Sequence, residues 1–208
     1  MIALRTLTLV VATYLLSGCA GMSEQACVTA DWRTIGFEDG SLGRSAANIG
    51  NYRQACADHG VAPDLDAYRA GHAQGVETYC RASHGFEVGR SGAVYQGVCP
   101  VELEHEFVAE YNAGRHLFEL ESSLRGIDAR VAADHRAQEN IKKELTSIAA
   151  TMIAADTTVE QRLHLVTRSA DLGRRYGELT SEIQQLEQDR VVAERELFDY
   201  QQTLAARF

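Results

Sequence analysis

Three polar residues in a glycine-rich stretch could form a binding or catalytic site: Asp39, Arg90 and Ser91. A carboxylate can act as an acid or a base, and an arginine beside a serine can bind an anion or a sugar carboxylate. Residues 89–92 read Gly-Arg-Ser-Gly, which is not the G-x-S-x-G spacing of a nucleophile elbow and is typical of an ordinary turn. We therefore predict no catalytic residue and keep these three residues as a possible loop site.

One glutamate–histidine pair has the spacing of a metal-ligand set. Glu102 and His105 form E-x-x-H, the arrangement found in carboxylate-bridged di-iron bundles. Such a site needs a second copy, and neither His116 nor His135 has a glutamate three residues before it. Acidic residues also favour a helix N-terminus, so the sequence predicts no metal site.

The first eighteen residues are typical of an export signal. Arg5 precedes an apolar run over 7–16 that is too short to span a bilayer as a mature helix. Residues 15–19, Leu-Leu-Ser-Gly-Cys, resemble the lipobox of bacterial lipoproteins. The resemblance implies cleavage before Cys19 and an N-acyl diacylglycerol lipid, with palmitate-type chains, on that residue; Ala20 after it implies transfer to the outer membrane. An ordinary cleaved signal with an accidental cysteine is the alternative.

Four cysteines remain once Cys19 is assigned to lipid: Cys27, Cys56, Cys80 and Cys99. An even number in a short module of an exported chain predicts two disulfides. A straight helix over 31–56 would keep Cys27 too far from Cys56, but we expect the run 43–51 to break it. We favour the pairs Cys27–Cys56 and Cys80–Cys99, and the other two connectivities stay open.

An aromatic residue followed by glycine recurs four times between residues 32 and 114. The spacings of three and four place the members of each set on one helical face. Because a glycine inside a helix costs up to about 1 kcal/mol relative to alanine, such a face needs a reason. Close helix packing is favoured over a groove in which a ligand approaches the backbone. The four sets are Trp32-Gly36-Gly40-Gly43, Tyr68-Gly71-Gly75-Tyr79, Phe86-Gly89-Gly92-Tyr95 and Phe107-Tyr111-Gly114.

These cysteine, glycine and aromatic positions together resemble a known family. The main matching residues are Cys27, Asp31, Trp32, Gly36, Asp39, Gly40, Gly43, Cys56, Gly60, Pro63, Asp64, Tyr68, Gly71, Gly75, Tyr79, Cys80, Phe86, Gly89, Arg90, Ser91, Gly92, Tyr95, Cys99, Pro100, Phe107, Tyr111 and Gly114. Over about 27–118 the pattern is similar to the bacterial lipoprotein family catalogued as domain of unknown function 2799. The resemblance implies a Gram-negative envelope lipoprotein of undetermined activity, and it offers no catalytic residues to transfer.

From residue 101 onward, apolar residues repeat every seven positions, with a second set three or four residues away. This pattern predicts two helices with coiled-coil seams, joined at 154–158, where Thr157 or Thr158 can cap the second helix. The polar residues Asp134, Gln138 and Arg190 interrupt the seams. The seam residues are Leu117, Leu120, Leu124, Ile127, Val131, Ile141, Leu145, Ile148 and Met152, followed by Leu165, Leu172, Tyr176, Leu179, Ile183, Leu186, Ala193, Leu197, Tyr200 and Leu204.

The sequence therefore predicts a mainly α protein. Two prolines and 7% aromatic residues favour helices over a sandwich or barrel. We expect a signal peptide over 1–18, a lipidated linker over 19–26, a small disulfide-stapled, glycine-rich helical module over 27–100 and a long antiparallel coiled-coil hairpin over 101–208. A net charge of −9, with Lys142 and Lys143 the only lysines, argues against nucleic-acid binding.

The predicted function is that of an outer-membrane lipoprotein facing the periplasm, a non-enzymatic structural or interaction protein of the cell envelope. We expect no cofactor apart from the lipid on Cys19. The expected partners are the membrane, through this anchor, and an envelope protein or a second copy, through residues 117–204. The alternative is a small periplasmic enzyme or ligand-binding protein with its site in the glycine-rich loops.

Overall fold

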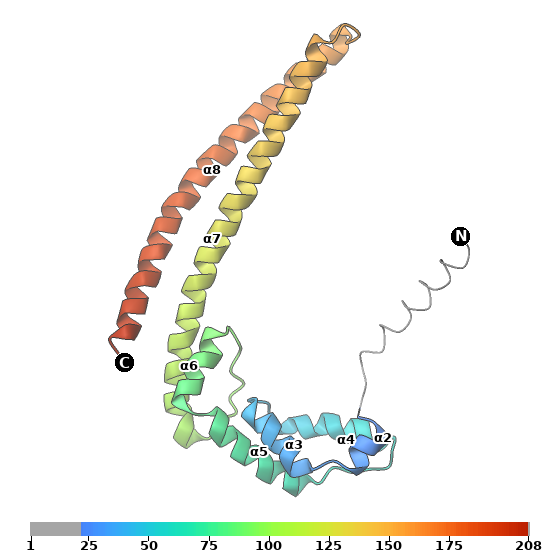
Figure 1. The fold of residues 1–208 in the computed structure, drawn as a ribbon, viewed down its shortest axis with the longest axis vertical. Helices are drawn as coiled ribbons and strands as arrows, with labels where there is room; N and C mark the ends of the chain where they lie inside the picture. The colour runs from blue at the N-terminus through green and yellow to red at the C-terminus, as the bar shows by residue number, and fades with distance from the viewer. Residues whose placement is uncertain (1–21, 208) are drawn as a thin grey trace, which may run out of the picture. The chain divides into compact units, whose positions relative to one another are not determined.

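The computed structural model describes residues 22–207, and the predicted signal peptide and Cys19 lie outside the described residues. Every regular element in the described part is helical, which confirms the mainly α class (Figure 1). The elements are α2 (Glu24–Val28), α3 (Trp32–Ser41), the 3-10 helix η2 (Ala46–Asn48), α4 (Ile49–Ala57), α5 (Leu65–Tyr79), α6 (Ala82–Arg90), α7 (Val101–Ile153) and α8 (Val159–Ala205).

The chain divides into two compact units. We call the described residues up to Gly114 the cysteine unit and those from Arg115 onward the arm unit. Helix α7 begins in the first unit and continues in the second. The sequence places the boundary at residue 100, where Pro100 precedes a helix, but the first turns of α7 pack within the cysteine unit. The cysteine unit therefore extends past Pro100 and includes α7 as far as Gly114.

Capping side chains explain where helices of the cysteine unit begin. The Asp31 carboxylate accepts hydrogen bonds from the backbone N–H groups of Arg33 and Thr34 at the start of α3. Asp64 caps α5 in the same way. The helix that begins at Trp32 ends at Ser41, and Gly43 has a φ of +68°, which turns the chain back. This is the predicted break between the first two cysteines.

Two buried disulfides close the cysteine unit. Cys27 pairs with Cys56 and Cys80 with Cys99, which is the pairing that the sequence favours, with Cα–Cα distances of 5.7 and 5.6 Å. Each bridge lies in its own apolar cluster. The first cluster also contains Trp32 and Tyr68, and the second contains Val76, Tyr79 and Phe107.

Helices α3 and α5 pack with their backbones in direct contact at glycines. Added Cβ atoms at Gly36 and Gly40 would lie 2.1 and 2.3 Å from the carbonyl oxygens of Tyr68 and His72, respectively. A Cβ at Gly71 of α5 would lie 1.9 Å from a backbone oxygen of α3. Residues later in α3 contact residues later in α5, so the two helices run parallel. The predicted close packing is confirmed for these glycines, but Gly43 and Gly92 lie in the turns after α3 and α6 and Tyr95 lies in a loop, so for them the predicted helical face is wrong.

Helix α6 and the start of α7 repeat this arrangement. A Cβ at Gly85 would lie 2.4 Å from the carbonyl oxygen of Phe107, as Gly36 does with Tyr68 in the first pair. A Cβ at Gly114 would lie 2.1 Å from the carbonyl oxygen of Phe86. The cysteine unit is thus built from two successive copies of one device, a pair of glycine-packed helices with a disulfide.

The glycine contact can be tested with Gly71→Ala and a control, Gly50→Ala in α4, where an added Cβ meets nothing within 4 Å. We expect Gly71→Ala to lower the free energy of unfolding by about 1–3 kcal/mol, because a methyl group cannot fit against the α3 backbone. Gly50→Ala should be neutral or stabilising by up to about 1 kcal/mol. Urea denaturation measures both, and equal effects would contradict the packing.

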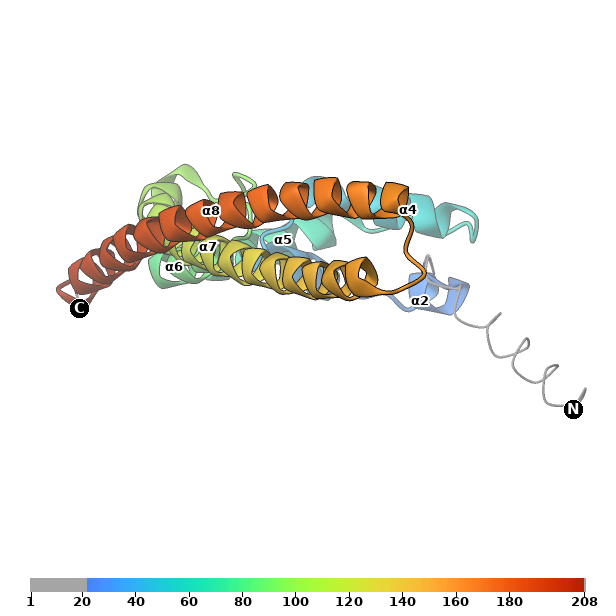
Figure 2. The same cartoon turned by 90° about the horizontal axis from the view of Figure 1, so that it is seen from above.

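In the arm unit, α7 and α8 lie side by side and run in opposite directions (Figures 1 and 2). Every large apolar residue buried in their contact is one that the sequence assigns to a seam. Contacts early in α7 are made with residues late in α8, as an antiparallel pair requires; they join His116 to Tyr200, Gln138 to Thr180 and Glu144 to Arg168.

The polar residues of the seam are accommodated in three different ways. Gln138 is buried and donates a hydrogen bond to Thr180 Oγ1 at 2.9 Å. Arg190 is part-exposed and pairs with Asp128 at 2.7 Å. Asp134 Oδ2 is buried and has no hydrogen-bond partner among the described residues. One carboxylate oxygen therefore weakens the seam, since an unpaired buried polar atom costs free energy.

Candidate functional site

The structure separates the three residues that the sequence groups as a possible loop site. Asp39 lies in α3, not in a loop, and is only 1% exposed, so the loop prediction is wrong for this residue. Arg90 is the exposed last residue of α6. Ser91 donates a hydrogen bond to the carbonyl of Val88 and accepts one from the N–H of Ala93, as turn chemistry requires.

Four donors occupy the two carboxylate oxygens of Asp39. Oδ1 accepts from the Arg44 guanidinium at 2.9 Å and from the Tyr52 hydroxyl at 3.2 Å. Oδ2 accepts from the Asn48 amide and the Tyr68 hydroxyl, each at 2.7 Å. The first three of these residues belong to the segment after α3, and the fourth belongs to α5. We call this set the Asp39 network; it ties the segment 43–52 to both helices.

The electrostatics of the Asp39 network keep its carboxylate charged. Burial raises the pKa of Asp39, but the hydrogen bonds it accepts outweigh burial, and its pKa lies below the ordinary value. Burial raises the pKa of Tyr68, and its hydrogen bond to the carboxylate raises it further. The tyrosines therefore remain donors and the carboxylate remains an acceptor. Its lone pairs are already used, which leaves little capacity for a general base.

The second helix pair has apolar residues at the positions where the first pair has two members of the Asp39 network. Val88 stands at the position equivalent to Asp39, and Phe107 stands at the position of Tyr68, so the carboxylate and its hydroxyl donor are missing together. A neighbouring hydrogen bond is kept in both pairs. His72 Nε2 lies 2.7 Å from the carbonyl oxygen of Arg44, and the Tyr111 hydroxyl donates to the carbonyl of Ala93 at 3.1 Å.

This comparison assigns the Asp39 network a structural role. Sequence reasoning selected Asp39 but missed Arg44, Asn48, Tyr52 and Tyr68 as its partners. The aligned glycine sets carried the signal, because they place an aspartate where the second copy has a valine.

We expect Asp39→Asn to lower the free energy of unfolding at pH 7 by about 2–4 kcal/mol, because the charged acceptor of four hydrogen bonds is lost. The folded-state pKa is lowered, so the contribution of Asp39 is present above its ordinary pKa and fades as the pH falls through the lower, folded value. The variant should therefore lose part of the acid sensitivity below about pH 4.

Chemical denaturation at pH 7 and pH 3 measures this difference. Asp58→Asn, at an exposed acid of the same unit, is the control and should change little. A stable Asp39→Asn variant at pH 7 would contradict the structural role of the network.

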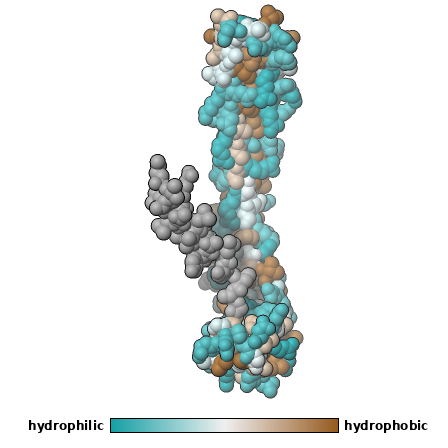
Figure 3. All heavy atoms as spheres, turned by 90° about the vertical axis from the view of Figure 1, so that its right-hand side faces the viewer, coloured by the Kyte–Doolittle hydropathy of each residue, from teal (hydrophilic) through white to brown (hydrophobic). Residues whose placement is uncertain are grey.

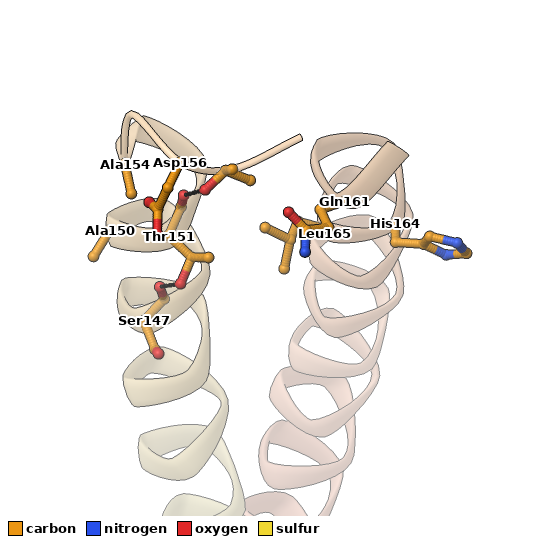
Figure 4. Close-up of a pocket in the computed structure, with 9 residues that line it drawn as sticks. Ser147, Ala150, Thr151, Ala154, Asp156, Gln161, His164 and Leu165 are labelled. Carbon is orange, nitrogen blue, oxygen red and sulfur yellow. Dashed lines mark hydrogen bonds between the residues drawn. The ribbon is translucent and has the colours of Figure 1, made fainter. Parts of the chain in front are cut away.

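A second candidate site lies at the end of the arm unit where α7 turns into α8. A groove of about 710 Å³ opens between the two helices there (Figure 4). Ser147 and Thr151 line it from α7, and Gln161, His164 and Leu165 line it from α8. The groove is open and lined mainly by small and polar side chains, so it does not have the convergent charged groups of a catalytic centre.

Hydrogen bonds hold the turn beside this groove. Thr158 caps α8 in a capping box with Gln161, which confirms the predicted cap. The guanidinium of Arg162 donates to the carbonyl oxygens of Met152 and Ala154, where α7 leaves its last carbonyls unpaired. The turn is therefore well ordered by its own residues.

Large apolar side chains are exposed at this end of the arm unit, in the last residue of α7 and the first turns of α8. We call Ile153, Val159, Leu163 and Val166 the arm-end cluster; they are 84%, 85%, 68% and 50% exposed. Apolar side chains gather at this end of the arm unit in Figure 3. Single exposed apolar residues are common, whereas several near one end of a helix pair form a candidate interaction surface.

The described residues form neither a metal-ligand cluster nor a membrane-spanning helix. Residues 22–207 contain no cluster of three or more His, Cys, Asp or Glu side chains placed to hold a metal ion. Within the same residues, no helix combines the length and apolar character needed to cross a membrane.

Comparison with known proteins gives one match, which lies mostly in the cysteine unit. Residues 31–116 match the model of a family described as "Protein of unknown function (DUF2799)". This stretch lies within residues 27–118, for which the sequence resembles that family, and it covers both glycine-packed helix pairs and ends beside Gly114. No curated protein and no solved structure matches the chain.

Proposed function

We propose that this protein is a lipid-anchored interaction protein of the Gram-negative cell envelope, held at the outer membrane through Cys19 and facing the periplasm. The lipobox-like residues 15–19 and the small residue Ala20 support the anchor. The two disulfides support an oxidising compartment, because such bonds persist outside the cytosol.

In this proposal the cysteine unit is a rigid base and the arm unit is an antiparallel coiled-coil hairpin that carries the binding surface. Leu172, Leu179, Leu186 and Ala193 support the coiled coil, because they are buried at intervals of seven residues. The Asp39 network and the glycine contacts support a structural role for the base.

The arm-end cluster is the observation that carries the proposal. The chain has a net charge of −9, and four of the seven exposed large apolar side chains in the described arm unit belong to the arm-end cluster; the other three are Val191, Val192 and Phe198. The loop-based alternative, an enzyme or ligand-binding protein, has no such support. The carboxylate of Asp39 is buried and fully engaged, and neither Arg90 nor Ser91 is among its partners.

The anchor can be tested by labelling growing cells with an alkyne analogue of palmitate. We expect the protein to take up the label, and we expect Cys19→Ala to abolish the labelling and release the chain from the membrane fraction. Cys27→Ala is the control for loss of any cysteine and should keep the label. Equal labelling of the Cys19→Ala variant would exclude a lipid at this residue.

The binding surface can be tested with photoreactive residues in intact cells. We expect protein adducts from positions 163 and 166 of the arm-end cluster and few from position 136, which is exposed on α7 outside the cluster. Gel mobility and mass spectrometry identify the adducts. If all three positions remain without adducts, the arm is not the binding surface.

A further inference from the structure

The exposed side of α8 carries a second row of uncharged residues. The row starts in the arm-end cluster and continues with alternating steps of four and three, so its members lie on one face of the helix. All of them are exposed, whereas Leu172 and Leu179, on the face toward α7, are buried. We call this row the outer stripe; its members are Val159, Leu163, Val166, Ala170, Gly173 and Gly177.

The glycines of the outer stripe have no packing role in the described chain. Gly173 and Gly177 have the same G-x3-G spacing as Gly36 and Gly40, whose added Cβ atoms would clash with α5. At Gly173 and Gly177 an added Cβ would meet nothing within 4 Å. Each costs the helix about 1 kcal/mol relative to alanine, and together they leave open the space that a partner helix needs for close approach.

Two copies of the outer stripe are complementary in side-chain size when they lie antiparallel. Its first half carries the large side chains and its second half carries the small ones. Val159 and Gly177 are equally distant from residue 168, and the same holds for Leu163 with Gly173 and for Val166 with Ala170. In an antiparallel pair of α8 helices centred there, every large residue would face a small one.

We propose that a second copy of this chain docks antiparallel on the outer stripe. Charge supports this orientation, because Glu160 and Arg174 flank the stripe at nearly equal distances from its centre, and the antiparallel pair brings opposite charges together. Arg174 now pairs with Asp171 and Glu178, but it is 69% exposed and can change partner at small cost. A parallel pair would place like residues, including Arg174, near one another.

The size of the contact sets the expected affinity. From Val159 to Gly177 the helix extends about 27 Å, at 1.5 Å per residue, which is short for a stable interface. We therefore expect a dimer that dissociates readily in dilute solution. This inference rests on the proposed function for one point only: a lipid anchor would raise the local concentration and make such a weak contact sufficient.

Sedimentation of the full-length protein in detergent, over a range of concentrations, tests the dimer. We expect a monomer–dimer equilibrium, and we expect Gly173→Leu with Gly177→Leu to weaken it at least tenfold, because the side chains fill the space that the second copy needs. Gly126→Leu is the matched control: this glycine of α7 is also open to solvent, so the dimer should persist. A wild-type monomer at all concentrations, or equal loss in the control, would overturn the proposal.

A charge exchange tests the orientation. Glu160→Arg and Arg174→Glu should each weaken the dimer, and the double variant should restore it, a result that misfolding cannot produce. Failure of the double variant to recover would overturn the antiparallel arrangement. A monomeric protein that still forms adducts with another protein in cells would refute this inference and leave the proposed function standing. If the protein isolated from cells carries no lipid on Cys19 and still dimerises, the anchor is refuted and this inference stands.

Discussion

The cysteine unit depends on the contact between helix backbones at glycines. With no side chain at Gly36 or Gly71, α3 and α5 approach until the Cα of one meets the carbonyl of the other. This contact buries little apolar side-chain area, and the unit is small, so other interactions must supply stability. The disulfides and the Asp39 network do so, the first by restricting the unfolded chain and the second by fixing the segment that returns from α3.

The two helix pairs have the same glycine contacts but different side chains beside them. The second pair fills its core with Val88 and Phe107, where the first uses Asp39 and Tyr68. A buried carboxylate is tolerated only where every lone pair finds a donor, so the aspartate, the tyrosine and the polar residues after α3 occur as a set. This explains why a residue that has the chemistry of a catalytic acid serves the fold here.

The helical elements, the disulfide pairing and the buried residues of α7 and α8 could be predicted from the sequence, because each depends on short-range sequence patterns. Cysteine parity and a glycine-containing break favour the observed pairing, and the seven-residue repeat gives the seam of α7 and α8. The burial of Asp39 could not be predicted, because glycine spacing identifies a helical face but not the partner that covers the neighbouring positions. The boundary at Gly114 was missed for the same reason: Pro100 marks where a helix starts, whereas packing against α6 decides which unit its first turns join.

We propose that the disulfide-closed, glycine-packed cysteine unit belongs to a lipid-modified chain outside the cytosol. Peptide mapping without reduction tests it most directly, on protein isolated from the membranes of its own host with free thiols blocked at lysis. We expect cross-linked peptides that join Cys27 to Cys56 and Cys80 to Cys99, together with a lipid-bearing N-terminal peptide that begins at Cys19. Blocked thiols at the four cysteines, or an unmodified peptide that continues through Cys19, would contradict it.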